Sequence, residues 1–396
     1  MKAIVIGGGI AGSSTAFALA KRNIQVTLIE RHAKLAQAAS GNPIAVLYPK
    51  LTSAPSLNND LTIAGFDFSI NLLKSLPKTP NLFDPCGLIQ LAFNTREKAR
   101  QMQLLQQKTS LKIQYITALQ ANAHAGCSIG GFDGIYIPQA AWVSPALWCA
   151  ALIQNFAQNI EKIFCSEALQ LQKTSDGWRV QTGKTTLEAD IVVICNANDV
   201  KQFNQCASVE ITPVRGQINF FTETEVSKNL KTIVSTDHFI SPAVAGLHTT
   251  GTTYAPNDSN PTLSDKDTHE NLLALRKIST ELFDSANHVT GRVSWRSQTL
   301  DYRPLAGQLL DEGELRINPP RYNADPANLP WLAGLYVNAG HGSKGMITAP
   351  LCGELIASLI TKNALPIAAK LTSSLNPSRF LLRELGLKQL AASLYK

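Results

Sequence analysis

Glycines near the start of the chain have the spacing that brings a peptide backbone against a phosphate group. Residues 7–12 read GGGIAG directly after the apolar run 4–6, and Glu30 closes a second apolar run. In this pattern Gly7 permits a tight turn, Gly9 lets the backbone approach a pyrophosphate, and Gly12 lets a helix pack against the strand. The helix N-terminus then offers free N–H groups to the pyrophosphate, and Glu30 can accept hydrogen bonds from a ribose diol. The spacing therefore predicts a dinucleotide-binding strand–turn–helix.

A second glycine cluster lies far along the chain. Residues 340–345 read GHGSKG between a predicted strand at 335–338 and a small-residue helix that runs to about residue 360. Its glycines would let the backbone approach a flat ring, and the helix N-terminus would face the N1/C2=O edge of a flavin, where negative charge gathers on reduction. Lys344 either adds charge at that edge or is solvated. His341 is expected to position the ring rather than to act as a general base.

The segments around these clusters indicate a sheet assembled from distant parts of the chain. Residues 189–195 form a near-continuous apolar run, typical of a central parallel strand buried on both faces, and residues 211–303 change to alternating strands. A discontinuous sheet suits FAD better than a nicotinamide cofactor, because FAD needs an ADP site and a separate cradle for its ring. The predicted fold class is α/β. A discontinuous Rossmann-like FAD-binding domain is expected at 1–80, 144–205 and 331–365, with an inserted, mostly antiparallel substrate domain at 81–143 and 206–330. A basic C-terminal extension is expected at 366–396.

Smaller elements follow from periodicity and capping residues. They predict helices at 12–22, 60–76, 95–107, 144–157 and 264–283, strands at 88–93, 168–172 and 178–182, and a hairpin or loop at 130–138. The strand that ends at Cys195 runs into Asn196-Ala197-Asn198. Because Asn tolerates the left-handed conformation better than other non-glycine residues, Asn198 is expected to form the turn.

Composition limits the class of protein. The 396 residues carry 36 Lys and Arg against 29 Asp and Glu, which gives a net charge of +7 and a pI near 9.0 and permits an RNA partner. The seven cysteines are scattered without a C-x-x-C pair, which favours reduced thiols in a cytoplasmic protein and argues against disulfides or a metal site. No apolar run approaches the ~18 residues of a membrane span, and the first strand leaves no room for a signal peptide.

Three motifs resemble a known superfamily. GGGIAG, the segment PVRGQ at 213–217 and GHGSKG resemble the D-amino-acid oxidase/glycine oxidase superfamily of FAD enzymes, over nearly the whole chain. More particular stretches are ASGNP at 39–43 continuing to LYPKL at 47–51, WVSP at 142–145, APL at 349–351 and NPSRF at 376–380. Together they resemble the FAD-dependent oxidoreductase half of the bacterial bifunctional proteins that modify the tRNA wobble uridine.

That resemblance implies a D-amino-acid oxidase-like fold and a reaction at position 34 of tRNA. The carboxymethylaminomethyl group on C5 of the wobble uridine would lose a hydride to FAD, and hydrolysis of the imine would leave aminomethyl-uridine and glyoxylate. The companion half of the family is a methyltransferase, for which this chain leaves no room. Either a separate methyltransferase acts on the product, or modification stops there, or the chain was excised. The cysteines do not lie where a covalent flavin link is expected, so FAD should be non-covalent.

The resemblance also implies site residues. Arg296 falls where the superfamily has the arginine that grips the substrate carboxylate, and its guanidinium offers a bidentate fork. The alternative for Arg296 is an interdomain or RNA-facing salt bridge. Asp301 is expected to be structural, Tyr254 to pack, and Arg215 either to be structural or to begin a loop beneath the flavin. The predicted catalytic residues are Arg296, His341 and Lys344, and the predicted FAD contacts are Gly7, Gly9, Ile10, Ala11, Gly12, Glu30, Arg31, Ser40, Gly41, Asn42, Gly340, Gly342, Ser343 and Gly345.

Charge near the end of the chain allows two interpretations. The basic residues Lys370, Arg379, Arg383 and Lys388 form either a solvated helix face or a contact for tRNA phosphates. Two rival functions also stay open: a free amino acid oxidase for glycine, sarcosine or a D-amino acid, and an FAD-containing tRNA-binding module with little turnover. The tRNA-modifying oxidase and the free amino acid oxidase both need a cationic group that binds the substrate carboxylate, here called the carboxylate anchor, whereas a binding module does not.

Overall fold

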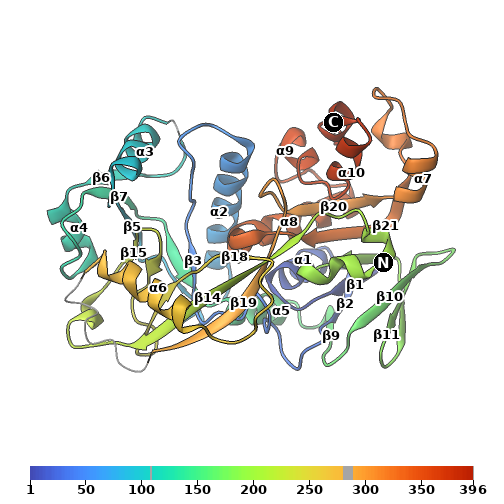
Figure 1. Ribbon diagram of the computed structural model, residues 1–396. Helices are drawn as coiled ribbons and strands as arrows, with labels where there is room; N and C mark the ends of the chain where they lie inside the picture. Colours follow the sequence, from blue (N-terminus) through green and yellow to red (C-terminus); the bar gives the residue numbers. More distant parts are fainter. Residues whose placement is uncertain (108, 280–288, 396) are drawn as a thin grey trace.

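Two large β-sheets organise the chain, and Figure 1 shows them side by side. The computed structural model describes residues 1–107, 109–279 and 289–395. The first sheet has six strands in the order β20–β21–β13–β1–β2–β9, all parallel except that β20 runs antiparallel to β21. Their bounds are β1 Lys2–Ile6, β2 Gln25–Ile29, β9 Ile160–Ile163, β13 Ile191–Ile194, β20 Leu305–Leu310 and β21 Trp331–Ala339. The predicted discontinuous α/β sheet is confirmed.

The two faces of this sheet are covered differently. Along β1, Ala3 and Val5 point into one apolar cluster while Ile4 and Ile6 point into another, as the two-residue period of a strand requires. The first cluster includes helices α1 Ile10–Ala20, α2 Leu57–Ser75, α5 Pro145–Gln154 and α8 Gly345–Thr361. The second includes the three-stranded sheet of β10 Ala168–Lys173, β11 Trp178–Thr182 and β12 Thr186–Ala189.

Helix α1 lies close to its strand because Gly12 has no side chain. A Cβ on Gly12 would lie 1.7 Å from the carbonyl oxygen of Gly7, so no other residue fits at this position. The same helix packs against α8, where a Cβ on Gly353 would lie 2.9 Å from the backbone nitrogen of Thr15. The close approach fixes the helix N-terminus at the carboxyl end of β1.

The second sheet has nine strands and is mostly antiparallel, with β15 and β5 as a parallel pair. Its strands are β5 Leu88–Leu91, β6 Gln114–Ile116, β7 Gly134–Ile137, β14 Thr212–Thr222, β15 Ile233–Ser235, β16 Phe239–Ile240, β17 Leu247–Gly251, β18 Ala255–Pro256 and β19 Thr290–Gln298. Figure 1 shows β14 and β19 extending from this sheet toward the helices of the first. A small sheet of β3 Ala45–Leu47, β8 Ala141–Val143 and β4 Phe83–Asp84 completes the strands.

The remaining helices lie at the margins of the molecule. They are α3 Thr95–Leu105, α4 Ala118–Ala125, α6 Asp265–Arg276, α7 Glu312–Ile317, α9 Ala369–Ser373, α10 Arg379–Glu384 and α11 Lys388–Ala391. Helix α6 follows its N-cap Ser264 and ends at Arg276, earlier than the predicted end at 283, and residues 280–283 of that prediction lie outside the described residues. The predicted hairpin or loop at 130–138 contains β7. No helix of the described residues combines the length and hydropathy needed to cross a membrane.

Strand β20 lies in the six-stranded sheet although the boundary expected at residue 331 would assign it to the substrate domain. It pairs with β21 from Leu305↔Ala339 to Leu310↔Trp331, and apolar residues fill both of its faces. Residues 311–330 connect β20 to β21 and contain α7, and their Leu315 and Leu329 are buried in an apolar cluster.

Candidate cofactor and substrate site

A cavity of about 570 Å³ has walls from both large sheets. The carboxyl ends of β1, β2, β13 and β21 form one side, and β14, β17 and β19 form the other. All the predicted site residues except Gly12 and Gly41 line this cavity. The lining residues are Gly7, Gly9, Ile10, Ala11, Glu30, Arg31, Ser40, Asn42, Arg296, Gly340, His341, Gly342, Ser343, Lys344 and Gly345. Residues 7–42 therefore meet Arg296 and residues 340–345, which lie more than 250 positions later in the sequence.

The turn before α1 is arranged by one serine and one glutamate. The backbone N–H of Ile10 donates to Ser40 Oγ at 3.0 Å, and that of Gly8 donates to Glu30 Oε2 at 2.6 Å. Glu30 Oε1 accepts from the backbone nitrogen of His32 at 2.8 Å and contacts its Nδ1 at 2.7 Å. A carboxylate offers about four acceptor positions, so Glu30 can still accept a bond from a ribose hydroxyl. The other N–H groups of the first helical turn remain available to a pyrophosphate.

The loop of residues 37–42, named the cofactor loop, is held by an arginine that the sequence analysis missed. Arg292 of β19 donates to the carbonyl oxygens of Gln37 (2.9 Å) and Ala38 (2.6 Å) and to Asn42 Oδ1 (3.0 Å). A Cβ on Gly41 would lie 2.6 Å from Arg292 Nη2, so Gly41 makes room for the guanidinium instead of lining the cavity. Burial lowers the pKa of Arg292. The nine-stranded sheet thereby fixes the loop that carries Ser40.

In the second glycine cluster, both ring nitrogens of His341 lie within hydrogen-bond distance of a neighbouring side chain. Its Nε2 lies 3.0 Å from Asn338 Oδ1 and its Nδ1 lies 2.9 Å from Thr348 Oγ1. Asn338 uses its Nδ2 to donate to Thr15 Oγ1 at 2.9 Å, so its Oδ1 is the acceptor for the ring. Burial lowers the pKa of His341 to about 3. The neutral ring can therefore donate from Nε2 to Asn338 Oδ1, and its Nδ1 faces the Thr348 hydroxyl, which donates to the carbonyl oxygen of Lys344 at 3.0 Å.

Lys344 lies on the cavity wall and not free in solvent. Its Nζ donates to Thr62 Oγ1 of α2 at 3.0 Å, and the Thr62 hydroxyl donates to the carbonyl oxygen of Asn58 at 2.6 Å. Burial, together with the nearby charge of Lys50, lowers the pKa of Lys344. Lys50 also lines this cavity.

Arg296 presents its guanidinium to the cavity from β19. Its Nη2 donates to Thr252 Oγ1 at 2.7 Å, and both terminal nitrogens lie 3.3 Å from the carbonyl oxygen of Thr253. The Thr252 hydroxyl in turn donates to the carbonyl oxygen of Gln217 at 3.1 Å. Burial lowers the pKa of Arg296, but a guanidinium stays charged in proteins. No carboxylate of the described residues lies within 4.0 Å of it, so its charge is available to a ligand.

Gly216 makes the position of Arg296 possible. It lies on β14 beside β19, where a Cβ would be 2.6 Å from Arg296 Nη2 and 2.7 Å from Nη1. The guanidinium therefore occupies the space that a side chain at position 216 would fill. This explains the glycine within the PVRGQ motif.

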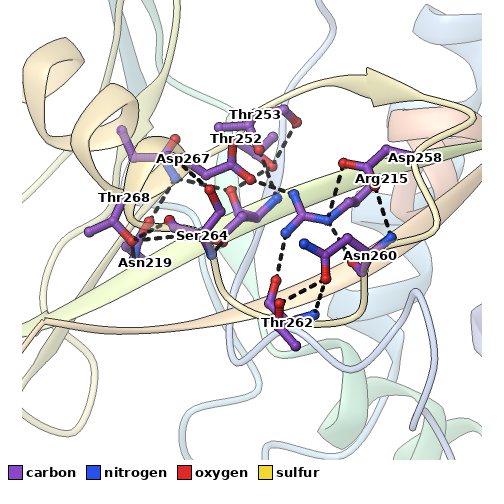
Figure 2. Close-up of polar contacts among 12 residues, drawn as sticks. Arg215, Asn219, Thr252, Thr253, Asp258, Asn260, Thr262, Ser264, Asp267 and Thr268 are labelled. Atoms are coloured by element: carbon purple, nitrogen blue, oxygen red, sulfur yellow. Dashed lines mark hydrogen bonds and ion pairs between the residues drawn. The ribbon is translucent and has the colours of Figure 1, made fainter.

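Arg215, the neighbour of Gly216, is structural and lies within β14 rather than at the start of a loop. It donates to the carbonyl oxygens of Asn260 and Thr262, both at 2.7 Å, and pairs with Asp267. Figure 2 shows this network, in which Arg215 ties the segment before α6 to the strand. Ser264 caps the helix by accepting from the backbone nitrogen of Asp267 at 3.3 Å. The network supports the back of the sheet whose front carries Arg296.

Two further expectations differ from the structure. The left-handed residue after β13 is Ala197, with φ of +55°, and not Asn198. Tyr254, expected to pack, is 53% exposed and lines the cavity. Asn196 also lines the cavity, and neither its Nδ2 nor its Oδ1 has a hydrogen-bond partner among the described residues. Since buried polar groups are normally bonded, this amide fits a polar ligand such as a flavin nucleotide.

Arg379 is neither solvated nor available to RNA, contrary to both readings of the basic stretch. It is 0% exposed and pairs with Asp301 at 2.8 Å, and Asp301 also accepts from Arg303 at 2.6 Å. Burial alone would raise the pKa of Asp301, but the hydrogen bond and charge of Arg379 outweigh it and lower the pKa to about 2. The expected structural role of Asp301 thus has a definite form: it joins the end of β19 to the segment after α8.

Comparison with known proteins gives a consistent result. Residues 2–359 match the family model described as FAD dependent oxidoreductase. The proteins named tRNA 5-methylaminomethyl-2-thiouridine biosynthesis bifunctional protein MnmC from Methylobacillus flagellatus and Pseudomonas syringae pv. syringae are 39% and 36% identical to this chain. These alignments cover 99% and 97% of this chain but 61% and 59% of the relatives, so the chain spans about three fifths of their length. The resemblance inferred from the motifs is confirmed.

A solved structure shows the same fold. Glycine oxidase from Bacillus cereus superposes with a TM-score of 0.77 at 20% identity, over 92% of this chain and 96% of that chain. The glycine turn, the cavity walls from two sheets and the amide of Asn196, unpaired among the described residues, suit the FAD named in the description of the matching family. Together with the family match over residues 2–359, they show that the chain belongs to the family of FAD-dependent oxidoreductases.

Proposed function

We propose that this enzyme oxidises the carboxymethylaminomethyl group on C5 of the tRNA wobble uridine, position 34, and leaves aminomethyl-uridine and glyoxylate. The observation that carries the proposal is Arg296, whose guanidinium faces the cavity without a carboxylate partner among the described residues. The group to be oxidised is an N-substituted glycine, and its carboxylate suits the guanidinium fork. The names of the relatives and the net charge of +7 support an RNA-borne substrate over a free amino acid.

The proposed reaction depends more on positioning of the substrate than on acid–base catalysis. When bound, FAD would supply the hydride acceptor for oxidation of the carbon between the substrate nitrogen and its carboxylate. Arg296 holds the carboxylate, and Thr252 fixes the guanidinium. His341 stays neutral and fixes the loop at 340–345. Water then adds to the C=N bond, and cleavage of the C–N bond releases glyoxylate and the primary amine.

The remaining parts of the proposal follow from the same site. FAD binds non-covalently, because the thiol of Cys195 on the cavity wall lies 3.9 Å from Thr15 Oγ1 and burial raises its pKa to about 12. A thiol held protonated is a poor nucleophile. Any methylation of the aminomethyl product is the work of another active site, such as a separate methyltransferase. A tRNA substrate would place the enzyme in the cytoplasm.

The test is anaerobic bleaching of the oxidised flavin band in the holoenzyme. Three additions are compared: tRNA bearing carboxymethylaminomethyl-uridine, the same tRNA without the modification, and free glycine or sarcosine. We expect bleaching with the modified tRNA alone, and glyoxylate in proportion to the flavin reduced. Bleaching by the free amino acids alone would make the protein a small-molecule oxidase. No bleaching with any addition would favour a tRNA-binding module with little turnover.

A further inference from the structure

Tyr254 is a large aromatic residue that the oxidation itself does not use. It lies between β17 and β18, lines the cavity and is 53% exposed. Its hydroxyl accepts a hydrogen bond from Gln298 Nε2 at 2.8 Å. An aromatic side chain that packs in a core would be covered, whereas this ring is held by its hydroxyl and leaves much of its surface uncovered.

The segment that carries Tyr254 also positions the carboxylate anchor. Arg296 donates to Thr252 and Thr253, the two residues before Tyr254, and Gln298 follows Arg296 by two positions on β19. Side chains two apart in a strand lie on the same face. Strand β19 therefore holds one short segment through two of its side chains, which places the ring beside the guanidinium.

The end of β19 also connects the ring to the second glycine cluster. Gln298 forms an isolated β-bridge with His341, whose loop lines the cavity. The Tyr254 ring is thus fixed relative to both the Arg296 anchor and the loop at 340–345. A substrate whose carboxylate binds Arg296 must place whatever follows its amine near this part of the wall.

We propose that Tyr254 is a specificity residue whose ring stacks on the pyrimidine of the substrate nucleoside. The inference rests on the proposed function and names the part of the substrate that the ring recognises. In an N-substituted glycine borne by a nucleobase, a planar ring follows the amine after one methylene, whereas free glycine and sarcosine have no planar ring to offer. Stacking on tyrosine is a common way for proteins to hold an unstacked RNA base, and it contributes without needing base-edge hydrogen bonds.

Three variants of the holoenzyme test this role. Tyr254→Ala removes the ring, Tyr254→Phe keeps the ring but removes the hydroxyl, and Tyr115→Ala is the matched control. Tyr115 is 47% exposed and its hydroxyl donates to Asp133 at 2.8 Å, but it lies on β6 away from the cavity lining. The probe is an anticodon stem-loop RNA carrying carboxymethylaminomethyl-uridine. Both its Kd and the limiting rate of anaerobic flavin reduction are measured.

We expect Tyr254→Ala to raise the Kd of the RNA by about 5- to 150-fold, with a much smaller effect on the limiting rate. Tyr254→Phe should stay near the wild-type Kd because the ring remains, and Tyr115→Ala should match the wild type in both measurements. A Kd for Tyr254→Ala within twofold of wild type would overturn the proposal, and so would an equal loss in the phenylalanine variant. If the wild type neither binds nor oxidises the RNA, the proposed function fails too. If the wild type oxidises it and Tyr254→Ala binds it normally, this inference alone fails.

Discussion

Substituting Gly216 by alanine would displace the carboxylate anchor through a single methyl group. The added Cβ would lie 2.6 Å and 2.7 Å from the terminal nitrogens of Arg296. Because unstrained contacts between such atoms lie near 3.5 Å, the guanidinium must move by roughly 0.8 Å. The obstacle is the far end of a flexible side chain, so the fold can accommodate the methyl group by letting Arg296 shift.

The expected result is a loss of function without a loss of stability. A displacement of about 1 Å in a positioning group costs on the order of 100-fold in rate, or ~2.7 kcal/mol of transition-state stabilisation. We therefore expect kcat/KM of the Gly216→Ala variant to fall about 100-fold for any carboxylate substrate that reduces the flavin. The free energy of unfolding should change by less than ~1 kcal/mol, as for most substitutions without a cavity or unpaired charge.

The assay compares stopped-flow flavin reduction with chemical denaturation for Gly216→Ala and for Gly183→Ala. Gly183 is the control because a Cβ there would meet nothing within 4 Å. FAD content should equal that of the wild type in both variants. Activity of Gly216→Ala within threefold of wild type would refute the argument that Arg296 needs this space. A large loss of stability in Gly216→Ala would show that strand β14 is distorted by the methyl group and that the guanidinium of Arg296 does not move.

Two further predictions concern arginines that hold the site together. Asp301→Asn leaves the buried Arg379 without its carboxylate and should lower the free energy of unfolding by about 3–5 kcal/mol, whereas Glu384→Gln, which breaks an exposed pair, should cost under ~1 kcal/mol. The pKa of Asp301 is lowered to about 2 from 3.8, so the stabilisation by its carboxylate is present above pH 4 and is lost as the pH falls through 2. The difference in unfolding free energy between wild type and Asp301→Asn must therefore disappear near pH 2. A difference that does not depend on pH contradicts the assignment. Arg292→Met should release the cofactor loop because its charge-assisted hydrogen bonds are lost, and titrations of the apoprotein should show a Kd for FAD about 10-fold higher. The control is Arg179→Met, which removes an exposed arginine. An unchanged Kd for Arg292→Met, or an equal change in the control, would contradict the role of Arg292.

Local signals in the sequence were sufficient for the elements that bind the cofactor. The turn at Gly7–Gly12, the helix after it and the buried strand β13 each depend on residues within about ten positions, so pattern alone predicts them. The second glycine cluster was predicted for the same reason. The sequence-derived boundary at 331 missed β20, because its membership of the sheet depends on pairing with β21 and not on its own composition.

Contacts between distant residues could not be predicted in this way. Arg379 looked basic and exposed because its partner, Asp301, lies 78 positions earlier. The role of Arg292 depends on the cofactor loop some 250 positions before it. Arg296 was identified by resemblance, but the reason that Gly216 must be a glycine appears only when β14 and β19 are paired. Pairing across a sheet is a tertiary property, and no local pattern encodes it.

The interleaved order of the six-stranded sheet has a consequence for how the protein is made. Gly7 leaves the ribosome roughly 20–60 s before Gly340 at usual rates, although both residues lie on the same wall of the cavity. During that interval helix α1 lacks α8 and β21 as packing partners. We therefore expect FAD to bind only after nearly all of these strands exist, so that a shortage of the flavin leaves finished apoprotein waiting for it and does not stall the early steps of folding.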